Sequence, residues 1–456
     1  MPTIWRLTIL ALLFVPWTGC PTDDDDDDDA TGAAPVISDV EAEVSEAVTM
    51  VVTVRWTTDV PSTGHVEFGL GDDLSLSTPA GTGAVTDHEA VLLGLPADAD
   101  ASYRVVAAAD GAVAEDEVRT ITTGPLPPEL PNPTVTGSGH DGYMAVPLLG
   151  AVSAATILDS AGRIVWFRLY EGELDLFRVR LSHDGSSVLF NAADVSDEPS
   201  AETEIVRVAL DGSSVTGVTI PWLAHDFVEL PDGTLTAIAL DIREVDGEDV
   251  RGDKLVEVSP NGTQTEIWST FDCWDPAEVV GTDPESGWTW TNAIDYDETG
   301  DDYYVGIRNL SSIVKIDRAT GACEWALGGA AATLEMVGDS SGFLHQHQFQ
   351  VLGDNVLVFD NDGGSGLASR AIEYELDLDA GTAEQTWSFT TDPPIYSFVL
   401  GDVNRFDDGD TLITWSVLGQ IDRVTAAGES VWRLNTAMGY ALGFDSVYGD
   451  LYASRW

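Results

Sequence analysis

Basic residues are scarce in this chain. Its 456 residues hold 20 Lys and Arg against 78 Asp and Glu, which gives a formal net charge of −58. Contacts to phosphate groups need Lys and Arg, so this balance argues against nucleic acid as a partner. The run Asp23–Asp29 supplies only seven of the negative charges. Most of the acidity must therefore lie on the folded surface, where it favours solubility.

Long hydrophobic runs are also missing, apart from one short stretch in residues 1–20. That segment has one basic residue, Arg6, an apolar stretch Leu7–Val15, and small residues ahead of Cys20. The stretch is too short to span a bilayer, and its end resembles the cleavage box of bacterial lipoprotein signals. We expect a signal peptide, lipid on Cys20 and an extended acidic tether over residues 21–34, with an uncleaved anchor as the alternative. The protein would then lie in the bacterial cell envelope, at the outer membrane, held there by its lipid alone.

Cysteine is scarce as well, with three in the chain. Once Cys20 is assigned to the lipid, Cys273 and Cys323 form an even pair outside the cytoplasm, which predicts a disulfide, with two buried free thiols as the alternative. The chain has no H-E-x-x-H or paired C-x-x-C, and its glycine-rich segments do not lead from a strand into a helix. The oxygen ligands at 241–249 and 360–363 match no calcium loop. We predict no metal and no cofactor, with a structural Ca2+ ion as the alternative.

Glycine is plentiful, and six glycines recur in turns that follow one apolar strand and begin another. They are spaced 47 to 60 residues apart: Gly162, Gly212, Gly262, Gly321, Gly381 and Gly428. Five copies carry a tryptophan four or six residues later, and an even offset keeps the indoles on one strand face: Trp166, Trp268, Trp325, Trp387 and Trp432. A second series of turns divides each repeat into two hairpins, hence four strands. Strands at this period predict a six-bladed β-propeller over residues 133–456.

Residues 35–123 form a separate unit ahead of these repeats. Short strands such as TMVVTVRWTT and ASYRVVAAAD follow one another at the spacing of a β-sandwich. The unit resembles a fibronectin-III or immunoglobulin-like sandwich, and a proline-rich linker over 124–132 ends it. The predicted fold class is therefore all-β, a sandwich followed by a propeller. Four histidines are expected to be unremarkable: His65 and His88 as strand residues, His140 and His183 as solvent-exposed ones.

The strand just before each second turn is expected to be the innermost strand of its blade and to line the central channel. His225, Asn292, His347 and Asn404 lie five to eight residues ahead of the turn glycines, at equivalent places in successive blades. They could therefore meet in one pocket. Histidine is well suited to proton transfer or nucleophilic attack near neutral pH, and His345 lies beside this set. The alternative is that these side chains only satisfy backbone groups around a water-filled channel.

Several phrases of the propeller match one family: HDFVELPDGTL at 225, WTWTNAIDYDETGDDYYVGIRNLSSIVKIDRATGACEWALGG at 288, HQHQFQVLGDNVLVFDN at 345, SRAIEYELD at 369 and GDVNRFDDGDTLITWS at 401. In them the chain resembles the bacterial arylsulfate sulfotransferases, which use no nucleotide sulfate donor. The resemblance implies a six-bladed propeller that moves a sulfuryl group between phenols through a sulfated histidine. It implies His347 as the nucleophile, and His225, Asn292 and Arg308 as hydrogen-bond donors to the sulfuryl oxygens.

The chain departs from the family motifs at two positions. Trp290 stands where the H-x-N motif has its histidine, and Gly306 where the S-x-R motif has its serine. An indole can only donate a hydrogen bond, so Trp290 cannot replace a histidine as an acid, base or acceptor. We expect Trp290, His345 and Asn404 to contact the substrate.

Three functions stay open. The first is a surface-anchored sulfotransferase acting on an aryl sulfate donor and a phenolic acceptor. The second is a propeller that binds phenolic or sulfated ligands without turnover, which the lost histidine favours. The third is a scaffold or adhesion module with an acidic surface.

Overall fold

The computed structural model describes residues 32–150, 152–196, 198–280, 287–362 and 368–448, which are almost entirely strand, turn and loop. The exceptions are a four-residue helix, α1 (Thr270–Cys273), and two short 3-10 turns, η1 (Arg308–Leu310) and η2 (Ser416–Leu418). The all-β class predicted from the sequence is confirmed. No helix in the described ranges is long and apolar enough to cross a membrane. The expected signal peptide, Cys20 and most of the acidic tether lie outside those ranges.

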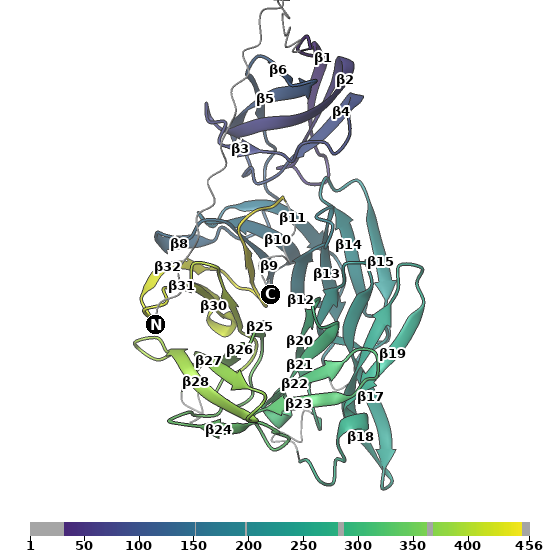
Figure 1. Cartoon of the computed structure of the whole chain (residues 1–456), viewed down its shortest axis with the longest axis vertical. Helices are drawn as coiled ribbons and strands as arrows, with labels where there is room; N and C mark the ends of the chain where they lie inside the picture. The colour runs from purple at the N-terminus through teal and green to yellow at the C-terminus, as the bar shows by residue number, and fades with distance from the viewer. Residues whose placement is uncertain (1–31, 151, 197, 281–286, 363–367, 449–456) are drawn as a thin grey trace, which may run out of the picture.

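Six sheets arranged around a common axis confirm the predicted six-bladed propeller (Figure 1). Taken from the axis outward, the first three blades are β33 (Leu442–Phe444), β9 (Tyr143–Leu148), β10 (Ser153–Asp159), β11 (Ile164–Tyr170); β12 (Asp175–Leu181), β13 (Ser187–Ala193), β14 (Glu204–Ala209), β15 (Val215–Thr219); and β16 (Leu223–Glu229), β17 (Leu235–Val245), β18 (Glu248–Val258), β19 (Gln264–Ser269). The others are β20 (Thr291–Asp297), β21 (Asp302–Ile307), β22 (Ser312–Asp317), β23 (Cys323–Leu327); β25 (Phe349–Leu352), β26 (Asn355–Asp360), β27 (Arg370–Asp377), β28 (Thr382–Phe389), β24 (Glu335–Val337); and β29 (Asp402–Arg405), β30 (Thr411–Trp415), β31 (Gln420–Val424), β32 (Ser430–Asn435), β8 (Thr134–Gly137).

The repeated glycines occupy the turn between the third and fourth strands of each blade. Their φ angles run from 69° to 84°, the left-handed region that glycine adopts without a steric penalty. The repeated tryptophans lie on the fourth strands, and two of them donate from Nε1 to the blade that follows: Trp166 to the Leu210 carbonyl (2.8 Å) and Trp387 to the Ala426 carbonyl (3.2 Å). Each acceptor lies beside the glycine turn of that next blade. In these copies the repeated indole therefore bonds one blade to the next.

Strands from both ends of the propeller chain close the ring. β33 pairs with β9 and becomes the innermost strand of the first blade, while β8 pairs with β32 on the outer edge of the last blade. Trp432 Nε1 donates to the Ser160 carbonyl oxygen (2.9 Å), which repeats the indole bond across the closing pair of blades. Each of these two blades contains a strand from the far end of the chain, so the ring cannot open without breaking a strand ladder.

The N-terminal unit is joined into one seven-stranded sheet by a single long strand, β2 (Val52–Leu70). The first half of β2 pairs with β1 (Ile37–Val44) and β4 (Val85–Leu92), and its second half pairs with β3 (Leu76–Ser77) and β5 (Asp100–Ala109). β6 (Ala112–Glu115) and β7 (Arg119–Thr122) both pair with β5. Trp56 and Phe68, from the two halves of β2, are buried in one core. The immunoglobulin or fibronectin-III class of this unit stays a prediction.

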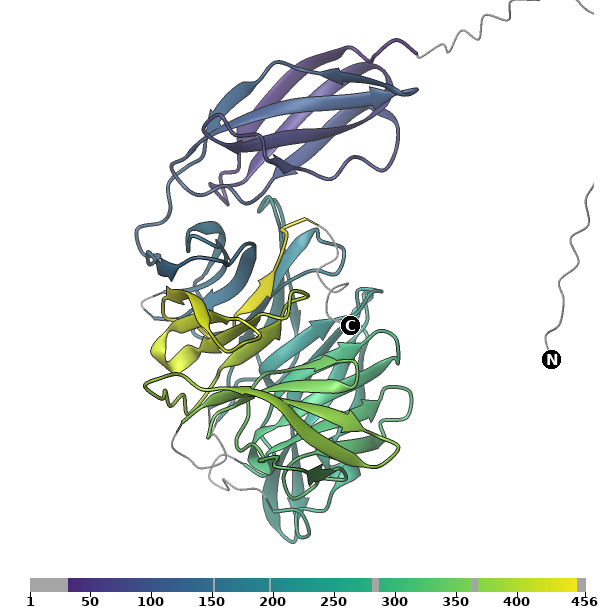
Figure 2. The ribbon, with the colours of Figure 1, turned by 60° about the vertical axis from the view of Figure 1, so that its left-hand side comes forward.

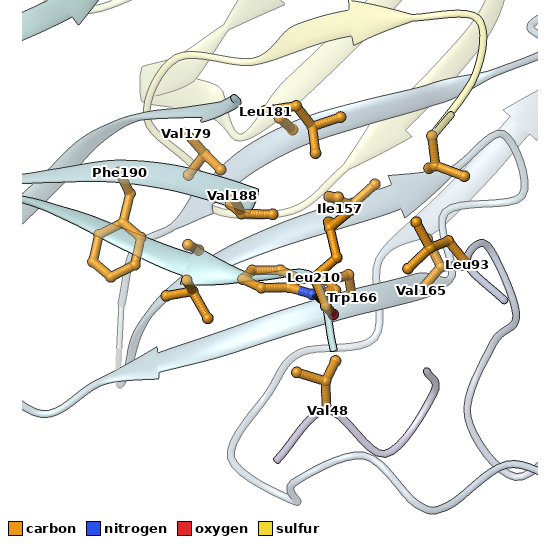
Figure 3. Close-up of a cluster of buried hydrophobic side chains, with 14 of the residues drawn as sticks. Val48, Leu93, Ile157, Val165, Trp166, Val179, Leu181, Val188, Phe190 and Leu210 are labelled. Carbon is orange, nitrogen blue, oxygen red and sulfur yellow. Dashed lines mark hydrogen bonds between the residues drawn. The ribbon is translucent and has the colours of Figure 1, made fainter. Parts of the chain in front are cut away.

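This unit packs on the edges of the first two blades (Figure 2). Val48 and Leu93 belong to the same buried cluster as Trp166 (Figure 3). Near the other end of the chain, the Tyr448 hydroxyl donates to the Val91 carbonyl (2.7 Å) and accepts from the Leu93 N–H (2.7 Å). Apolar contacts and hydrogen bonds thus hold the unit on the propeller.

Two histidines expected to be exposed are not. His140 is 3% exposed, with its ring 4.7 Å from the ring of Trp432 and Nδ1 3.2 Å from Nη1 of Arg423. Burial, followed by the charge of Arg423, lowers the pKa of His140 to about 4. His183 is half-buried, with Nε2 3.0 Å from Oε1 of Glu298. His140 directly follows β8, which pairs with β32 from the far end of the chain. Burial that depends on such a distant strand leaves no local signal in the sequence.

Cys273 in α1 is bonded to Cys323 at the start of β23, with their Cα atoms 6.1 Å apart. The bond joins the third blade to the fourth across 50 residues of sequence. Trp268 Nε1 lies 3.3 Å from the sulfur of Cys273 and 3.4 Å from that of Cys323. In this blade the repeated indole therefore packs against the disulfide.

Candidate active site

The residues singled out in the sequence lie where the innermost strands begin. Strands alternate in direction within each blade, and every blade repeats the same order of directions. The innermost strands β16, β20, β25 and β29 therefore all begin at the same end of the channel. Just ahead of each, a residue other than glycine has a left-handed φ: Trp222 (60°), Trp290 (54°), His345 (54°) and Leu400 (55°). Such residues are strained, and strain of this kind collects at functional sites. The repeated distortion marks this end of the channel as the candidate site.

His347 is held in one tautomer by Asn361. His347 is 2% exposed, and its Nδ1 lies 2.8 Å from Oδ1 of Asn361. Nδ2 of Asn361 donates to the carbonyl oxygens of Ser397 (2.7 Å) and Leu400 (2.9 Å), which leaves its Oδ1 to face the imidazole. Nδ1 of His347 must then carry the proton, and the lone pair lies on Nε2.

The environment also keeps the His347 ring uncharged. Burial lowers the pKa of His347 to about 3; the hydrogen bond with Asn361 opposes this shift, while His225 and the positive charge of Arg308 add to it. A neutral imidazole with a lone pair on Nε2 is a nucleophile at neutral pH. His225 and Arg308 both act on the pKa of His347, so both lie close enough to affect its charge.

His225 is buried too, and one of its ring nitrogens has no protein partner. Burial lowers the pKa of His225 to about 3; Arg308 and Arg251 add to the shift, whereas Asp226 and a hydrogen bond to the Thr291 backbone oppose it. That backbone bond occupies one nitrogen as a donor, and Nδ1 is buried without a partner. Nδ1 of His225 is therefore a bare acceptor.

Arg308 provides the cationic donor of the site. It begins η1, directly after β21, and its backbone N–H donates to the carbonyl oxygen of Trp290 (3.1 Å). Nδ2 of Asn292 donates to the Gln346 carbonyl (2.9 Å), and its Oδ1 is buried without a protein partner. Three donors were expected from the sequence. Asn292 keeps its second Nδ2 hydrogen as a donor, and Nδ1 of His225 is buried without a protein partner.

Trp290 forms a wall beside His225. The two rings meet edge to face at 5.5 Å between centroids, and the guanidinium carbon of Arg251 lies 5.4 Å from the indole centroid. With Asp253 these residues line a cavity of about 10 Å3, room for one water molecule. Nε of Arg251 is buried without a protein partner, and Val195, Ala224 and Leu240 add an apolar wall to the same cavity.

The other two residues expected to contact the substrate, His345 and Asn404, lie in different surroundings. Nδ1 of His345 lies 2.5 Å from Oδ2 of Asp362, at the same end of the channel as His347. Asn404 lies on β29, and its Oδ1 accepts from the backbone N–H of Gly443 (3.2 Å). That bond ties the innermost strands β29 and β33 together.

A buried ion network was missed in the sequence. Arg178 Nε lies 3.2 Å from Asp226 Oδ1, and its Nη1 lies 2.7 Å from Asp402 Oδ2. Arg180 Nη2 is 3.2 Å from Asp226 Oδ1, and Gln348 Nε2 donates to Asp226 Oδ2 (3.0 Å). Burial opposes the ionisation of Asp226, but the two arginines outweigh it and its pKa is lowered. Both arginines lie on β12, ahead of a His-Asp-Gly turn, so the register rule applied to the second blade would have found them.

One group of carboxylates in the described ranges has the spacing of a metal site: Asp302, Asp317 and Glu324. Nζ of Lys315 lies 2.8 Å from an oxygen of Asp302 and 2.8 Å from an oxygen of Glu324. The ammonium group of Lys315 thus lies between Asp302 and Glu324, and a metal ion would have to displace it. The prediction of no metal, with a structural Ca2+ ion as the alternative, stays a prediction.

The fold and the site together define a six-bladed propeller that holds a neutral, oriented imidazole at the end of its channel, under the electrostatic influence of an arginine. The sequence profile of the arylsulfotransferase (ASST) family matches residues 150–436, and the chain belongs to that family. No curated protein matches the chain. Similar solved structures include a protein of unknown function from Bacteroides caccae, 14% identical with a TM-score of 0.44, covering 67% of this chain and 100% of that one. Another is the catalytically inactive virginiamycin B lyase from Staphylococcus aureus with quinupristin, 13% identical with a TM-score of 0.38, covering 67% of this chain and 88% of that one.

Proposed function

We propose that this protein moves a sulfuryl group from an aryl sulfate ester to a phenol through a sulfated His347. The family supports a sulfotransferase-like function. The observation that carries the mechanism is the contact between His347 and Asn361, because it leaves Nε2 as the nitrogen with the lone pair.

In the first half-reaction, the Nε2 lone pair forms a bond to sulfur while the bond between sulfur and the aryl oxygen breaks. The electron pair of the broken bond leaves on the phenolate. Nδ1 keeps its proton, so the imidazole becomes cationic and its hydrogen bond to Oδ1 of Asn361 gains charge assistance. Arg308 donates to the sulfuryl oxygens as charge redistributes; one preorganised donor of this kind is worth about 3 kcal/mol.

In the second half-reaction, the oxygen of the acceptor phenol attacks sulfur and the bond between sulfur and nitrogen returns its electrons to Nε2. The phenol proton must leave, and Nδ1 of His225, which is buried without a protein partner, is the atom that would receive it in the transition state. Because burial lowers the pKa of His225 to about 3, the proton would not stay there and would pass to solvent. His225 would then act as a proton acceptor, a different role from the donor that the family resemblance implies. Neither half-reaction, as written, needs a metal or a cofactor.

The cellular setting belongs to the same proposal. The short apolar stretch and the small residues before Cys20 support export and lipid attachment. The enzyme would work at the outer membrane, held by lipid on Cys20, on small aryl sulfates and phenols. The N-terminal unit would be an immunoglobulin-like or fibronectin-III domain that carries no catalytic group.

The deciding experiment incubates the purified protein with 4-nitrophenyl sulfate and no acceptor. A sulfuryl adduct of about 80 Da should appear on the wild-type protein and be lost when phenol is added, as expected for a covalent intermediate. His347→Asn should show neither the adduct nor transfer. Adduct formation by His347→Asn would place the nucleophile elsewhere.

One observation favours a second function, a propeller that binds aryl sulfates without turnover. Trp290 occupies the position of the motif histidine, packs on His225 and leaves a cavity of about 10 Å3. Tight binding of aryl sulfates by wild-type protein that forms no adduct and transfers nothing would support this function instead. An adhesion or scaffold role would be supported by the absence of both binding and transfer.

A further inference from the structure

The loop between β28 and β29 presents two exposed aromatic side chains. Tyr396 is 46% exposed and Phe398 is 53% exposed, with ring centroids 6.5 Å apart. Ser397 between them is fully buried. The backbone at Ser397 is therefore packed into the protein, and the flanking rings are left in solvent. Exposed apolar side chains that gather on one surface of a folded protein, rather than standing alone, mark a candidate binding surface.

The backbone of this loop is bonded to the residue that orients the nucleophile. The carbonyl oxygen of Ser397 accepts from Nδ2 of Asn361 (2.7 Å), and Oδ1 of the same amide contacts His347 (2.8 Å). The N–H of Ser397 donates to Oγ of Ser369 (2.8 Å). One amide group thus connects the loop carrying both rings to the imidazole of His347, which fixes the rings close to the candidate site.

Tyr396 is also tied to the site through its hydroxyl. The hydroxyl donates to Oδ1 of Asp362 (2.9 Å), whose Oδ2 lies 2.5 Å from Nδ1 of His345. Burial and the bond to Asp362 raise the pKa of Tyr396, and the charge of Arg308 opposes them. Arg308 is therefore within electrostatic reach of Tyr396, His347 and His225 alike.

Other exposed apolar side chains lie at the same end of the channel. Trp222 and Leu344 precede innermost strands, and Val417 and Leu418 lie in η2, between the second and third strands of the last blade. Their exposures are 41%, 37%, 41% and 52%. Because strands alternate in direction, the loops ahead of first strands and those between second and third strands share one end of a propeller. The rings of Tyr396 and Phe398 therefore share this end of the channel with four other exposed apolar side chains.

We propose that Tyr396 and Phe398 form an aryl-binding platform that holds the aromatic ring of the substrate while its sulfate group faces Arg308 and His347. The inference rests on the proposed function and names the feature of the substrate that is recognised. The net charge explains why an aryl-binding platform would help: a protein of net charge −58 repels an anionic ester over most of its surface. Stacking on aromatic rings is insensitive to that repulsion. The platform would thus select flat, uncharged ring systems.

The test uses naphthalene-2-sulfonate, whose sulfonate is attached through carbon and so mimics the ester without being transferred. With the full-length chain, Phe398→Ala and Tyr396→Ala should each weaken its binding about 10-fold in calorimetry. They should raise KM for 2-naphthyl sulfate by a similar factor and leave kcat unchanged. Tyr396→Phe keeps the ring and should bind nearly as well as wild type. Leu378→Ala, equally exposed at 54% but at the other end of the propeller, is the matched control.

The platform and the proposed function can fail separately. Unchanged binding of naphthalene-2-sulfonate in both alanine variants, or no binding by the wild type, would overturn the platform whatever the sulfuryl adduct shows. Weakened binding in the variants together with no adduct on wild-type His347 would sustain the platform and overturn the transfer reaction. A loss in Leu378→Ala equal to that in Phe398→Ala would also count against the platform, because both would then reflect a general loss of fold.

Discussion

Nδ1 of His347 lies 2.8 Å from Oδ1 of Asn361, and this contact decides which imidazole nitrogen carries the proton. Asn361→Leu removes the acceptor and frees the proton to move to Nε2, where it blocks attack on sulfur. We expect transfer to fall about 100-fold or more, as wrong-tautomer variants of other enzymes do. The variant also loses the bonds from Nδ2 to the carbonyl oxygens of Ser397 and Leu400, so binding of naphthalene-2-sulfonate should weaken as well, but by less than the loss of transfer.

Asn361→Asp should act differently, because a carboxylate favours the charged imidazolium and raises the pKa of His347. The acid limb of the pH profile of kcat/KM should move to higher pH while transfer at high pH is retained. Superimposable profiles for Asn361→Asp and the wild type would show that Asn361 does not act on the nucleophile.

Arg308 influences both site histidines and Tyr396, and we expect its loss to harm chemistry more than binding. Arg308→Ala should lower kcat for aryl sulfate transfer roughly 100-fold, the usual cost of removing a preorganised donor. Arg308→Lys should recover part of the rate. Arg168→Ala, on the outer strand β11, is the control. A change confined to KM would reduce Arg308 to a binding residue.

The buried neutral histidines should make the protein sensitive to acid. The folded pKa of His347 and of His225 is about 3, below the ordinary value near 6.5, so between these values the unfolded chain binds protons that the folded protein excludes. Their contribution to stability is complete above pH 6.5 and is lost as pH falls towards 3. For each histidine, the free energy of unfolding should fall by about 1.4 kcal/mol for every unit by which the pH is lowered across that window.

Urea denaturation of wild type and His347→Asn at pH 7 and pH 4.5 isolates one histidine. The wild type should lose about 3 kcal/mol more than the variant over that interval. Equal losses would mean that His347 is protonated in the folded protein.

The repeats could be predicted from the sequence because their cause is local. Each repeated glycine occupies a turn with a left-handed φ that glycine adopts most easily, and each repeated tryptophan lies on the fourth strand of its blade. Both residue types can therefore be read from the sequence as markers of the repeat. His347, His225, Asn292 and Arg308 could be placed by blade register and by the family motifs. The register rule works because equivalent positions in different blades converge on one axis.

What could not be predicted depends on contacts between distant segments. Asn361 lies in a loop between β26 and β27, and its role follows only from the carbonyl groups of Ser397 and Leu400. The same holds for His140, which is buried by the closing strand. The left-handed φ at Trp290 also carries no sequence signal, since tryptophan does not favour that region.

The disulfide between Cys273 and Cys323 should add stability without affecting the site. It closes a loop of 50 residues and should contribute on the order of 3–4 kcal/mol by restricting the unfolded chain. Cys273→Ser with Cys323→Ser should therefore unfold at lower urea and still transfer sulfuryl groups at the wild-type rate. Two alkylatable thiols in exported wild-type protein under non-reducing conditions would rule out the bond.

Trp290→His distinguishes an active enzyme from a disabled one. In the proposed reaction the indole of Trp290 packs on His225, and the guanidinium of Arg251 lies over the indole face. An imidazole at position 290 is smaller, so it would enlarge the cavity and loosen His225, the residue that accepts the phenol proton. We therefore expect kcat to fall, with binding of naphthalene-2-sulfonate retained because Tyr396 and Phe398 are unchanged. Trp290→Phe, which keeps an apolar ring, should lie between the two. If Trp290→His instead raises transfer above that of the wild type, the tryptophan has blocked the site, and the binding propeller becomes the better account of the natural protein.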